Sequence, residues 1–250
     1  GLSDGGFIVT WASGLQDGDR NGVYGQRYND LGEPVGTEFQ INSYTNSDQD
    51  RPSVTALADG GYVVAWNSGG GQDGDLYGIF GQRFDGSDVA VGNEFQINTT
   101  TAGYQIQPSI ASLPDGGFIV SWTGSIDANT NGPRHIYAQR YDDNSSPVGQ
   151  ELQVDTVHAA DNSTGAAPSV SSFSDGGFVI TWATPWHDAE RGEIYGQRFD
   201  ANGTAEGSEF QVNTVTANEQ YGSAVQTLTG GGFVVAWQSA EVSISGFFIG

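Results

Sequence analysis

The sequence predicts an all-β fold, a β-propeller-like array of four-stranded blades. One string carries most of this prediction: GGFIVTW at 5–11 returns as GGYVVAW, GGFIVSW, GGFVITW and GGFVVAW. The tryptophans that end the five copies are 55, 56, 60 and 55 residues apart. Self-similarity at a nearly fixed period is the signature of a repeat architecture. The chain therefore reads as five tandem repeats of about 55 residues.

Four short strand-like runs make up one repeat. In the second repeat they are 52–57, 60–66, 79–85 and 94–98, rich in β-branched or aromatic residues and bounded by Gly, Asn, Asp or Pro. The run 60–66 has large apolar residues at successive positions, which is typical of a strand buried on both faces. Repeated four-stranded sheets of this length indicate the blades of a propeller.

A single repeat domain is expected over 1–250, with incomplete blades at both ends. The long connections, such as 43–51, follow the fourth run, so each blade begins at the first run. Two arrangements stay open: part of a longer or polymerising array, or five blades with one strand missing or supplied by a neighbouring chain. The expected blades are 1–42 (partial), 52–98, 108–155, 168–213 and 222–250 (partial).

The charge balance narrows the choice of partners. The chain has 30 acidic residues against 8 basic ones, a net charge of −22, and every basic residue is arginine. Nucleic acids and anionic membranes need basic patches, so we expect neither as a partner. No apolar run is long enough to insert into a bilayer. The chain contains no cysteine, which excludes a small disulfide scaffold.

A constant spacing links the third and fourth runs. Arg27 and Glu38 are 11 residues apart, and the same Arg–Glu spacing occurs in the next three repeats. A hairpin of constant length predicts that Arg27 lies opposite Glu38 as a cross-strand ion pair. Because the pair occurs in several repeats, we interpret it as structural and not catalytic.

The loop between the second and third runs is the candidate metal site. In the first repeat it reads Asp17-Gly-Asp19-Arg-Asn21-Gly22, an oxygen ligand at every second position followed by glycine. This pattern begins many calcium loops, although Tyr28 stands where an EF-hand has its glutamate. Asp, Asn and Gly are also common turn formers, so an ordinary acidic turn is the alternative. The candidate Ca²⁺ ligands are Asp17, Asp19, Asn21, Asp73, Asp75, Asp127, Asn129 and Asn131.

The repeat strings support a resemblance to a known group of proteins. GGFVVAW at 231–237, IYGQRFD at 194–200 and EFQVN at 209–213 resemble the repeats of very large bacterial secreted and cell-surface proteins, many of them with RTX-type calcium-binding sections. The resemblance spans essentially the whole chain. The loop at 17–22 is also loosely similar to the calcium loops of integrin-type propellers. The resemblance implies an extracellular or cell-surface location and an adhesive or structural role.

These observations favour a non-enzymatic structural or adhesive module, stabilised by calcium. Its expected partners are further copies or neighbouring repeats, in a filament or on a cell surface, with glycans as a further candidate. The first alternative is a lectin-like propeller whose loop aromatics stack on sugars. Those aromatics are Trp186, Tyr44, Tyr77 and Tyr104. The second alternative, a propeller-fold hydrolase, requires a carboxylate cluster that breaks the repeat, and we identify none from the sequence.

Overall fold

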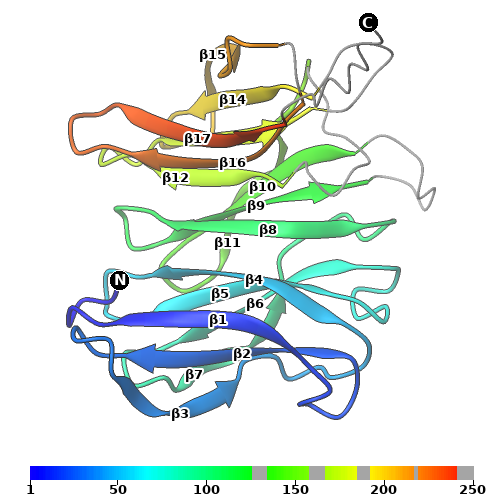
Figure 1. The fold of residues 1–250 in the computed structure, drawn as a ribbon, viewed down its shortest axis with the longest axis vertical. Coiled ribbons are helices and arrows are strands. Elements are labelled where there is room, and N and C mark those ends of the chain that lie inside the picture. The colour runs from blue at the N-terminus through cyan, green and yellow to red at the C-terminus, as the bar shows by residue number, and fades with distance from the viewer. Residues whose placement is uncertain (126–133, 158–166, 185–191, 217–218, 241–250) are drawn as a thin grey trace, which may run out of the picture.

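The computed structural model describes residues 1–125, 134–157, 167–184, 192–216 and 219–240. These residues contain seventeen β-strands, numbered in Figure 1. The strands are β1 (Phe7–Gly14), β2 (Asn21–Tyr28), β3 (Pro34–Gln40), β4 (Gln49–Ala56), β5 (Tyr62–Ser68), β6 (Gly78–Phe84), β7 (Ala90–Gln96), β8 (Gln105–Ser112), β9 (Phe118–Gly124), β10 (His135–Tyr141), β11 (Pro147–Gln153), β12 (Ser169–Ser172), β13 (Phe178–Ala183), β14 (Ile194–Phe199), β15 (Ala205–Gln211), β16 (Gln220–Thr227) and β17 (Phe233–Ser239).

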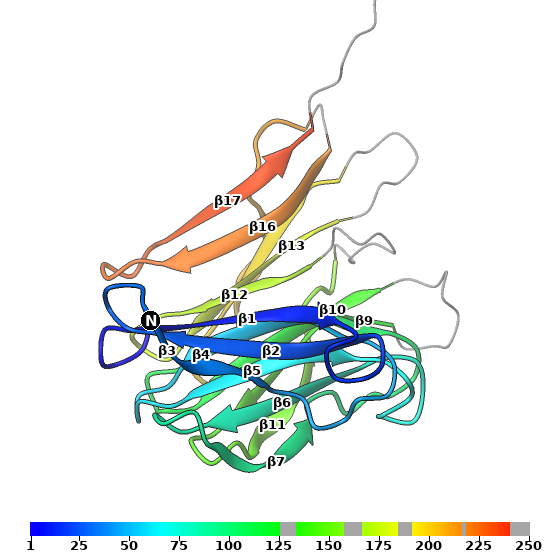
Figure 2. The same cartoon turned by 60° about the horizontal axis from the view of Figure 1, so that its bottom comes forward.

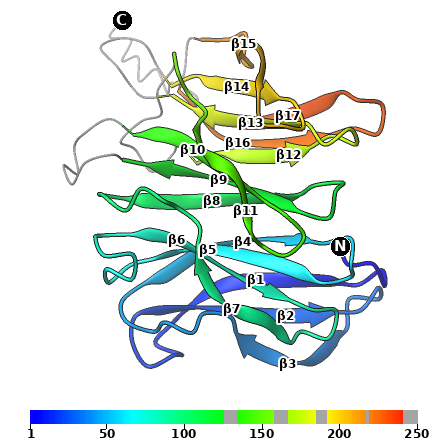
Figure 3. The ribbon, with the colours of Figure 1, turned by 180° about the vertical axis from the view of Figure 1, so that it is seen from behind.

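The strands form five antiparallel sheets, one per repeat. The first sheet is β1–β3, the next three are β4–β7, β8–β11 and β12–β15, and the last is β16–β17. Figure 1 shows β1–β3 at the bottom of the view and β12–β15 at the top, where β16 and β17 overlap them, and Figure 3 shows the outer strands β7 and β11 from behind. The first strands β4, β8, β12 and β16 contact one another along the inside. The predicted all-β array of four-stranded blades is confirmed, and we call the sheets blades 1 to 5.

The second strand of each interior blade is buried on both faces, as its sequence predicts. In blade 2, Tyr62, Val64 and Trp66 pack against blade 1. The alternate residues Val63 and Ala65 pack against blade 3. The three interior tryptophans are fully buried: Trp66, Trp122 and Trp182.

The predicted ion pair between Arg27 and Glu38 is wrong. A β-bulge between Gly25 and Arg27 shifts the hairpin register, so Arg27 lies opposite Val35. The Arg27 guanidinium instead binds the Asp4 carboxylate at 2.7 Å, in the turn before β1. The constant hairpin length predicts the position of the turn but does not reveal the bulge. One bulge changes the cross-strand partner of every residue between it and the turn.

The repeated glutamate links successive blades. Glu94 of β7 accepts hydrogen bonds from the backbone N–H of Ser43, at 2.7 Å, and from its hydroxyl, at 2.9 Å. Glu151 binds Thr99 in the same way. These carboxylates therefore hold the connection that leaves the preceding blade.

Serine hydroxyls link the inner strands. The Ser109 hydroxyl of β8 accepts a hydrogen bond from the Val170 N–H of β12 at 3.2 Å. The same contact joins Ser53 to Ile110 at 3.3 Å and Ser169 to Val225 at 3.0 Å. The serine of the repeated Pro-Ser pair thus gives each inner strand an acceptor for its neighbour's backbone, a polar partner that a buried N–H requires.

The terminal blades each keep one outer face exposed. Phe7 and Val9 of β1 are exposed, as are Val234 and Trp237 of β17. Figure 2 shows β16 and β17 extending beyond the other sheets. Within the described part of the chain, no helix has the length and apolar character needed to cross a bilayer.

Candidate functional site

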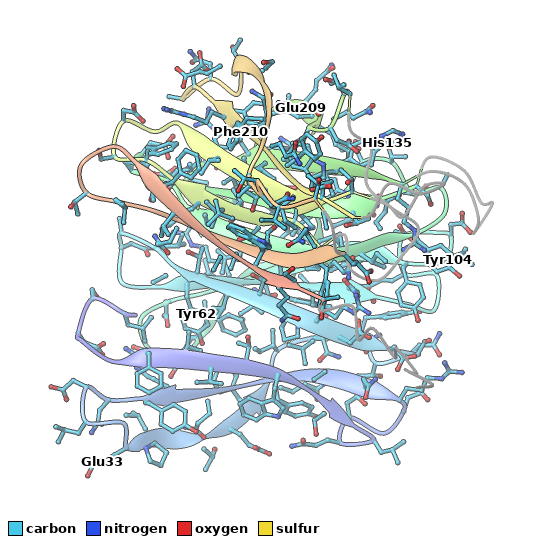
Figure 4. All side chains as sticks on the ribbon, turned by 45° about the horizontal axis from the view of Figure 1, so that its top comes forward. Glu33, Tyr62, Tyr104, His135, Glu209 and Phe210 are labelled. Carbon is cyan, nitrogen blue, oxygen red and sulfur yellow. The ribbon has the colours of Figure 1, made fainter. Side chains whose placement is uncertain are left out.

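One end of the blades collects the variable loops, and we call it the loop end. Here the second strand leads into the third, and the connection from the preceding blade enters the inner strand. Gln49 at the start of β4 pairs with Ser68 at the end of β5, so both lie at this end. The opposite end carries the tight turns and is called the hairpin end. Figure 4 shows Tyr104 toward the loop end and Tyr62 toward the hairpin end.

Two carboxylates lie at the loop end where β4 begins. Asp48 and Asp50 flank Gln49, whose side chain is fully buried. Residues two apart on an extended chain project to the same side, with Cα atoms about 6–7 Å apart. A second β-bulge, between Asp50 and Ser53, lies directly after this pair. Bulges often redirect side chains beside functional sites.

Asp50 has an environment that favours its protonated form. Burial raises the pKa of its carboxyl group, and the negative charge of Asp48 adds to this effect. The hydrogen bond from the Asn67 amide, at 2.7 Å, and the charge of Arg51 oppose the shift but do not cancel it. Such a carboxyl can hold a proton at a higher pH than an ordinary aspartate.

Asp48 has cationic and amide partners instead. The Arg20 guanidinium forms an ion pair with one carboxylate oxygen at 3.2 Å. The Asn21 side-chain amide donates to the other oxygen at 2.9 Å. Asp48 thus has an arginine partner, whereas burial raises the pKa of Asp50, so the environments of the two neighbouring aspartates differ.

Aromatic side chains lie at the same end, where blade 2 meets the connection to blade 3. The rings of Tyr77 and Tyr104 stack with their centroids 5.7 Å apart, and the two residues form a parallel β-bridge. The Arg134 guanidinium lies 5.4 Å from the centre of the Tyr104 ring. Burial raises the pKa of Tyr77, and the charges of Asp48 and Asp50 contribute, so this stack is close to the carboxylates. Two of the aromatics expected in the loops are therefore brought together.

The predicted metal ligands of the first loop bind parts of the protein. The Asp17 carboxylate accepts hydrogen bonds from the Asp19 N–H at 3.3 Å and from the Asn42 amide at 3.4 Å. Asp19 accepts one from the Ser47 N–H at 2.7 Å. Asn21 donates to Asp48, as described above. These contacts tie the loop to the connection that follows β3.

The second loop repeats this arrangement. Asp73 accepts hydrogen bonds from the Asp75 N–H and from the Asn98 amide, both at 3.2 Å, and Asp75 accepts one from the Gly103 N–H at 2.7 Å. No three acidic or histidine side chains gather as a metal-binding group among the described residues. Calcium binding stays a prediction, which unfolding temperatures with Ca²⁺ and with chelator would test. Outside the described residues lie Asp127, Asn129, Asn131 and Trp186.

The two carboxylates at the start of β4 were not predicted from the sequence. The corresponding positions of the next repeat are Tyr104 and Ile106, so Asp48 and Asp50 break the repeat. An alignment of the repeats on their Pro-Ser pairs, Pro52-Ser53 and Pro108-Ser109, would have shown the two aspartates opposite apolar or aromatic residues.

Comparisons with known proteins show the fold. No protein-family model matches the sequence, and no curated protein matches it significantly. Among solved structures, an α-L-arabinofuranosidase from Fusarium graminearum with a bound iminosugar inhibitor gives a TM-score of 0.62 at 14% identity, covering 94% of this chain and 72% of that chain. An endo-arabinase from Bacteroides thetaiotaomicron gives 0.54 at 13% identity, covering 94% and 89%.

A third similar structure has a bound sugar. An α-L-arabinanase from Penicillium chrysogenum, complexed with arabinobiose, gives a TM-score of 0.54 at 11% identity, covering 96% of this chain and 79% of that chain. These similar proteins are five-bladed β-propellers, and the likeness extends over nearly the whole of this chain.

The comparisons correct the expected function. The expectation of a non-enzymatic, adhesive or filament-forming module is contradicted, because the similar structures carry the names of arabinan-degrading enzymes. An extracellular location, self-association and the kinship with secreted bacterial repeats stay predictions. The β-propeller fold of this chain is also the fold of these carbohydrate-active enzymes.

Proposed function

We propose that this protein binds an arabinan-type glycan at the loop end and hydrolyses it there. The observation that carries the proposal is the pair formed by Asp50, whose pKa is raised by burial, and Asp48, which is paired with Arg20. Glycoside hydrolysis commonly uses two carboxyl groups with opposite roles, one as acid and one as base or nucleophile. Two neighbouring carboxyl groups in unlike environments meet that requirement.

Each group has a defined part in the proposed reaction. The protonated Asp50 gives its proton to the glycosidic oxygen as the bond from that oxygen to the anomeric carbon breaks. The Asp48 carboxylate takes a proton from the water that attacks the anomeric carbon. The products are two shorter glycans, and one water molecule is consumed. Positioned acid–base groups of this kind contribute about 10²–10⁴-fold each to a rate.

The aromatic stack gives the glycan a place to lie. Sugar rings present apolar C–H faces that pack on aromatic rings, while their hydroxyls bind polar groups. Tyr77 and Tyr104 supply the rings, and Arg134 beside Tyr104 supplies hydrogen-bond donors. Tyr77 and Tyr104, two of the loop aromatics expected for a lectin-like site, would thus hold a sugar beside Asp48 and Asp50.

The test is release of reducing ends from linear arabinan. We expect the wild-type protein to cleave it and Asp50→Asn to lose at least about 10²-fold in rate while still binding the glycan. Asp30→Asn is the matched control, because Asp30 is an exposed carboxylate in the hairpin-end turn after β2. The proposal fails if the wild type neither binds nor cleaves arabinan, or if Asp50→Asn cleaves it at the wild-type rate.

A further inference from the structure

Equivalent contacts recur where neighbouring blades meet at the hairpin end. In the interface between blades 1 and 2, the Arg27 guanidinium reaches the Asp88 carboxylate at 3.1 Å, in the turn between β6 and β7. The Tyr62 hydroxyl donates to the same carboxylate oxygen at 3.1 Å. The Asp88 carboxylate therefore occupies this interface and is bound by both Arg27 and Tyr62.

The interface between blades 2 and 3 lacks that carboxylate. Ser145 stands in the place of Asp88, with the same left-handed backbone, φ 62° against φ 64°. Phe118 replaces Tyr62 and has no hydroxyl. The Arg83 guanidinium here binds the backbone carbonyl of Asp143 in place of a carboxylate of the neighbouring turn, while its other terminal nitrogen binds Asp59. The Ser145 hydroxyl is buried and has no hydrogen-bond partner among the described residues.

A groove of about 390 Å³ opens where the carboxylate is missing. That volume is within the range of small-molecule sites in proteins. The groove lies between β7 and the turn that joins β10 to β11. Its floor and walls include Arg83, Asn93, Phe95, Asp143, Asn144 and Ser145.

The third interface lacks the same combination for another reason. In blades 3 and 4, Gly203 stands in the place of Ser145, and Leu152 in the place of Phe95. A side chain added at Gly203 would come within 3.3 Å of Leu152, so the leucine occupies the space itself. Among these three described interfaces, only the one between blades 2 and 3 combines an aromatic side chain, Phe95, with a turn residue, Ser145, whose side chain is too short to fill the space beside it.

The chemistry of the groove favours a neutral sugar. Arg83 already binds Asp59 at 2.6 Å, and the exposed Asp143 adds another negative charge, so an anionic ligand would be repelled. The remaining amide and hydroxyl groups of Asn93 and Ser145 both donate and accept hydrogen bonds. Phe95 is partly exposed and gives a sugar ring an apolar face to pack on.

We propose that this groove binds one neutral sugar residue of a glycan, at a subsite remote from the loop end. The inference rests on the proposed function, because it assigns the protein a second contact with the same class of ligand. Asp50 and Ser145 lie toward opposite ends of the strands, so the groove retains the glycan and takes no part in bond cleavage.

The decisive variant is Ser145→Asp. It places a carboxylate where blade 2 carries Asp88, and the left-handed backbone at Ser145 matches that of Asp88, so the fold tolerates it. Titration with arabinotriose, followed by the amide NMR signals of Gly92 and Gln49, reads the groove and the loop end separately. We expect Ser145→Asp to weaken the response at Gly92 at least tenfold and to leave that at Gln49 unchanged.

Control variants separate this proposal from the catalytic one. Asn202→Asp adds the same charge to the equivalent turn of blade 4 and should leave the response at Gly92 intact. Phe95→Leu, which copies the third interface, should weaken it. A response at Gly92 that survives Ser145→Asp, or equal binding of galacturonate, would overturn the inference. Loss of the Gln49 response alone, with Gly92 still responding, would contradict the proposed function but not the groove.

Discussion

The interior and terminal blades carry nearly the same strand but bury it differently. In β9 of blade 3 the residues Phe118 and Trp122 are fully buried, whereas in β17 of blade 5 Trp237 is 40% exposed. The two tryptophans make the same hydrogen bond, from the indole N–H to a glutamine on the inner strand, at 3.0 and 2.8 Å. The difference is the neighbouring sheets. The repeated string thus encodes an interface between blades and not a self-contained strand.

The polar contacts differ in the same way. The Ser109 hydroxyl in blade 3 accepts a hydrogen bond from the backbone N–H of the next inner strand, but the matching position of blade 5 is Ala224. In the interior blades this hydroxyl binds the backbone of the next inner strand. Interior blades therefore have both the buried apolar side chains and the serine acceptor, whereas blade 5 has the apolar strand without the serine.

The largest expected effect comes from the tryptophans. Trp122→Ala should lower the free energy of unfolding by about 3–5 kcal/mol, because it leaves a cavity between two sheets. Trp237→Ala should cost about 2 kcal/mol less than Trp122→Ala, since its side chain is 40% exposed and buries correspondingly less apolar surface. Urea unfolding of both variants measures the difference. Equal losses of unfolding free energy would contradict the conclusion that the neighbouring blades bury Trp122 more fully than Trp237.

A smaller effect is expected from the serine contacts. Ser109→Ala removes the acceptor of the Val170 N–H, and an unpaired buried donor costs about 1–3 kcal/mol. Ala224→Ser, the matched change in blade 5, should alter stability by less than about 0.5 kcal/mol. Thermal unfolding of the two variants reads the contrast. A stabilised Ala224→Ser protein would show that blade 5 has a further partner for this hydroxyl.

The smallest effect distinguishes blade 3 from its neighbours and depends on pH. Asp155 replaces the asparagine found in blades 1 and 2, and it binds His135 at 3.3 Å. Asp155 raises the pKa of His135 through that hydrogen bond. The pair therefore stabilises the fold fully below the ordinary histidine pKa of 6.5, and this stabilisation is lost as the pH rises through the raised pKa.

Asp155→Asn tests this assignment by giving blade 3 the asparagine of the other blades. The variant should be less stable than the wild type at about pH 5, and the gap should shrink by about pH 9. Unfolding temperatures across this range measure it, with His135→Gln as a second variant that removes the other partner and should show the same pH dependence. A gap that is constant or that grows with pH contradicts the assignment.

The sequence predicts the blades well because their determinants are local and repeated. The five Trp-ended strings and the tight turns recur, and each recurrence marks the second strand of a blade, which is buried between sheets in the three interior blades. The pairing of Arg27 was predicted wrongly because one bulge, with no clear mark in the sequence, decides the register. Side-chain partners between blades depend on that register, so they could not be read from spacing.

The candidate site was harder to predict than the fold. Asp48 and Asp50 lie in a long acidic connection, where carboxylates are common and most serve turns or solvent. What distinguishes Asp50 is its burial beside Asn67 at the bulge, which only the assembled inner strands create. The calcium pattern drew attention to Asp17 and Asp19, whose carboxylates accept hydrogen bonds from the connection that follows β3, and calcium binding there stays a prediction.

A titration of the Asp50 carboxyl carbon by ¹³C NMR, with and without arabinotriose, tests the proposed function most directly. The account predicts a pKa above the ordinary value of 3.8 in the free protein, and a change in both signal and pKa when the sugar binds. A pKa at or below 3.8 with no response to the sugar would contradict the assignment of Asp50 as the proton donor.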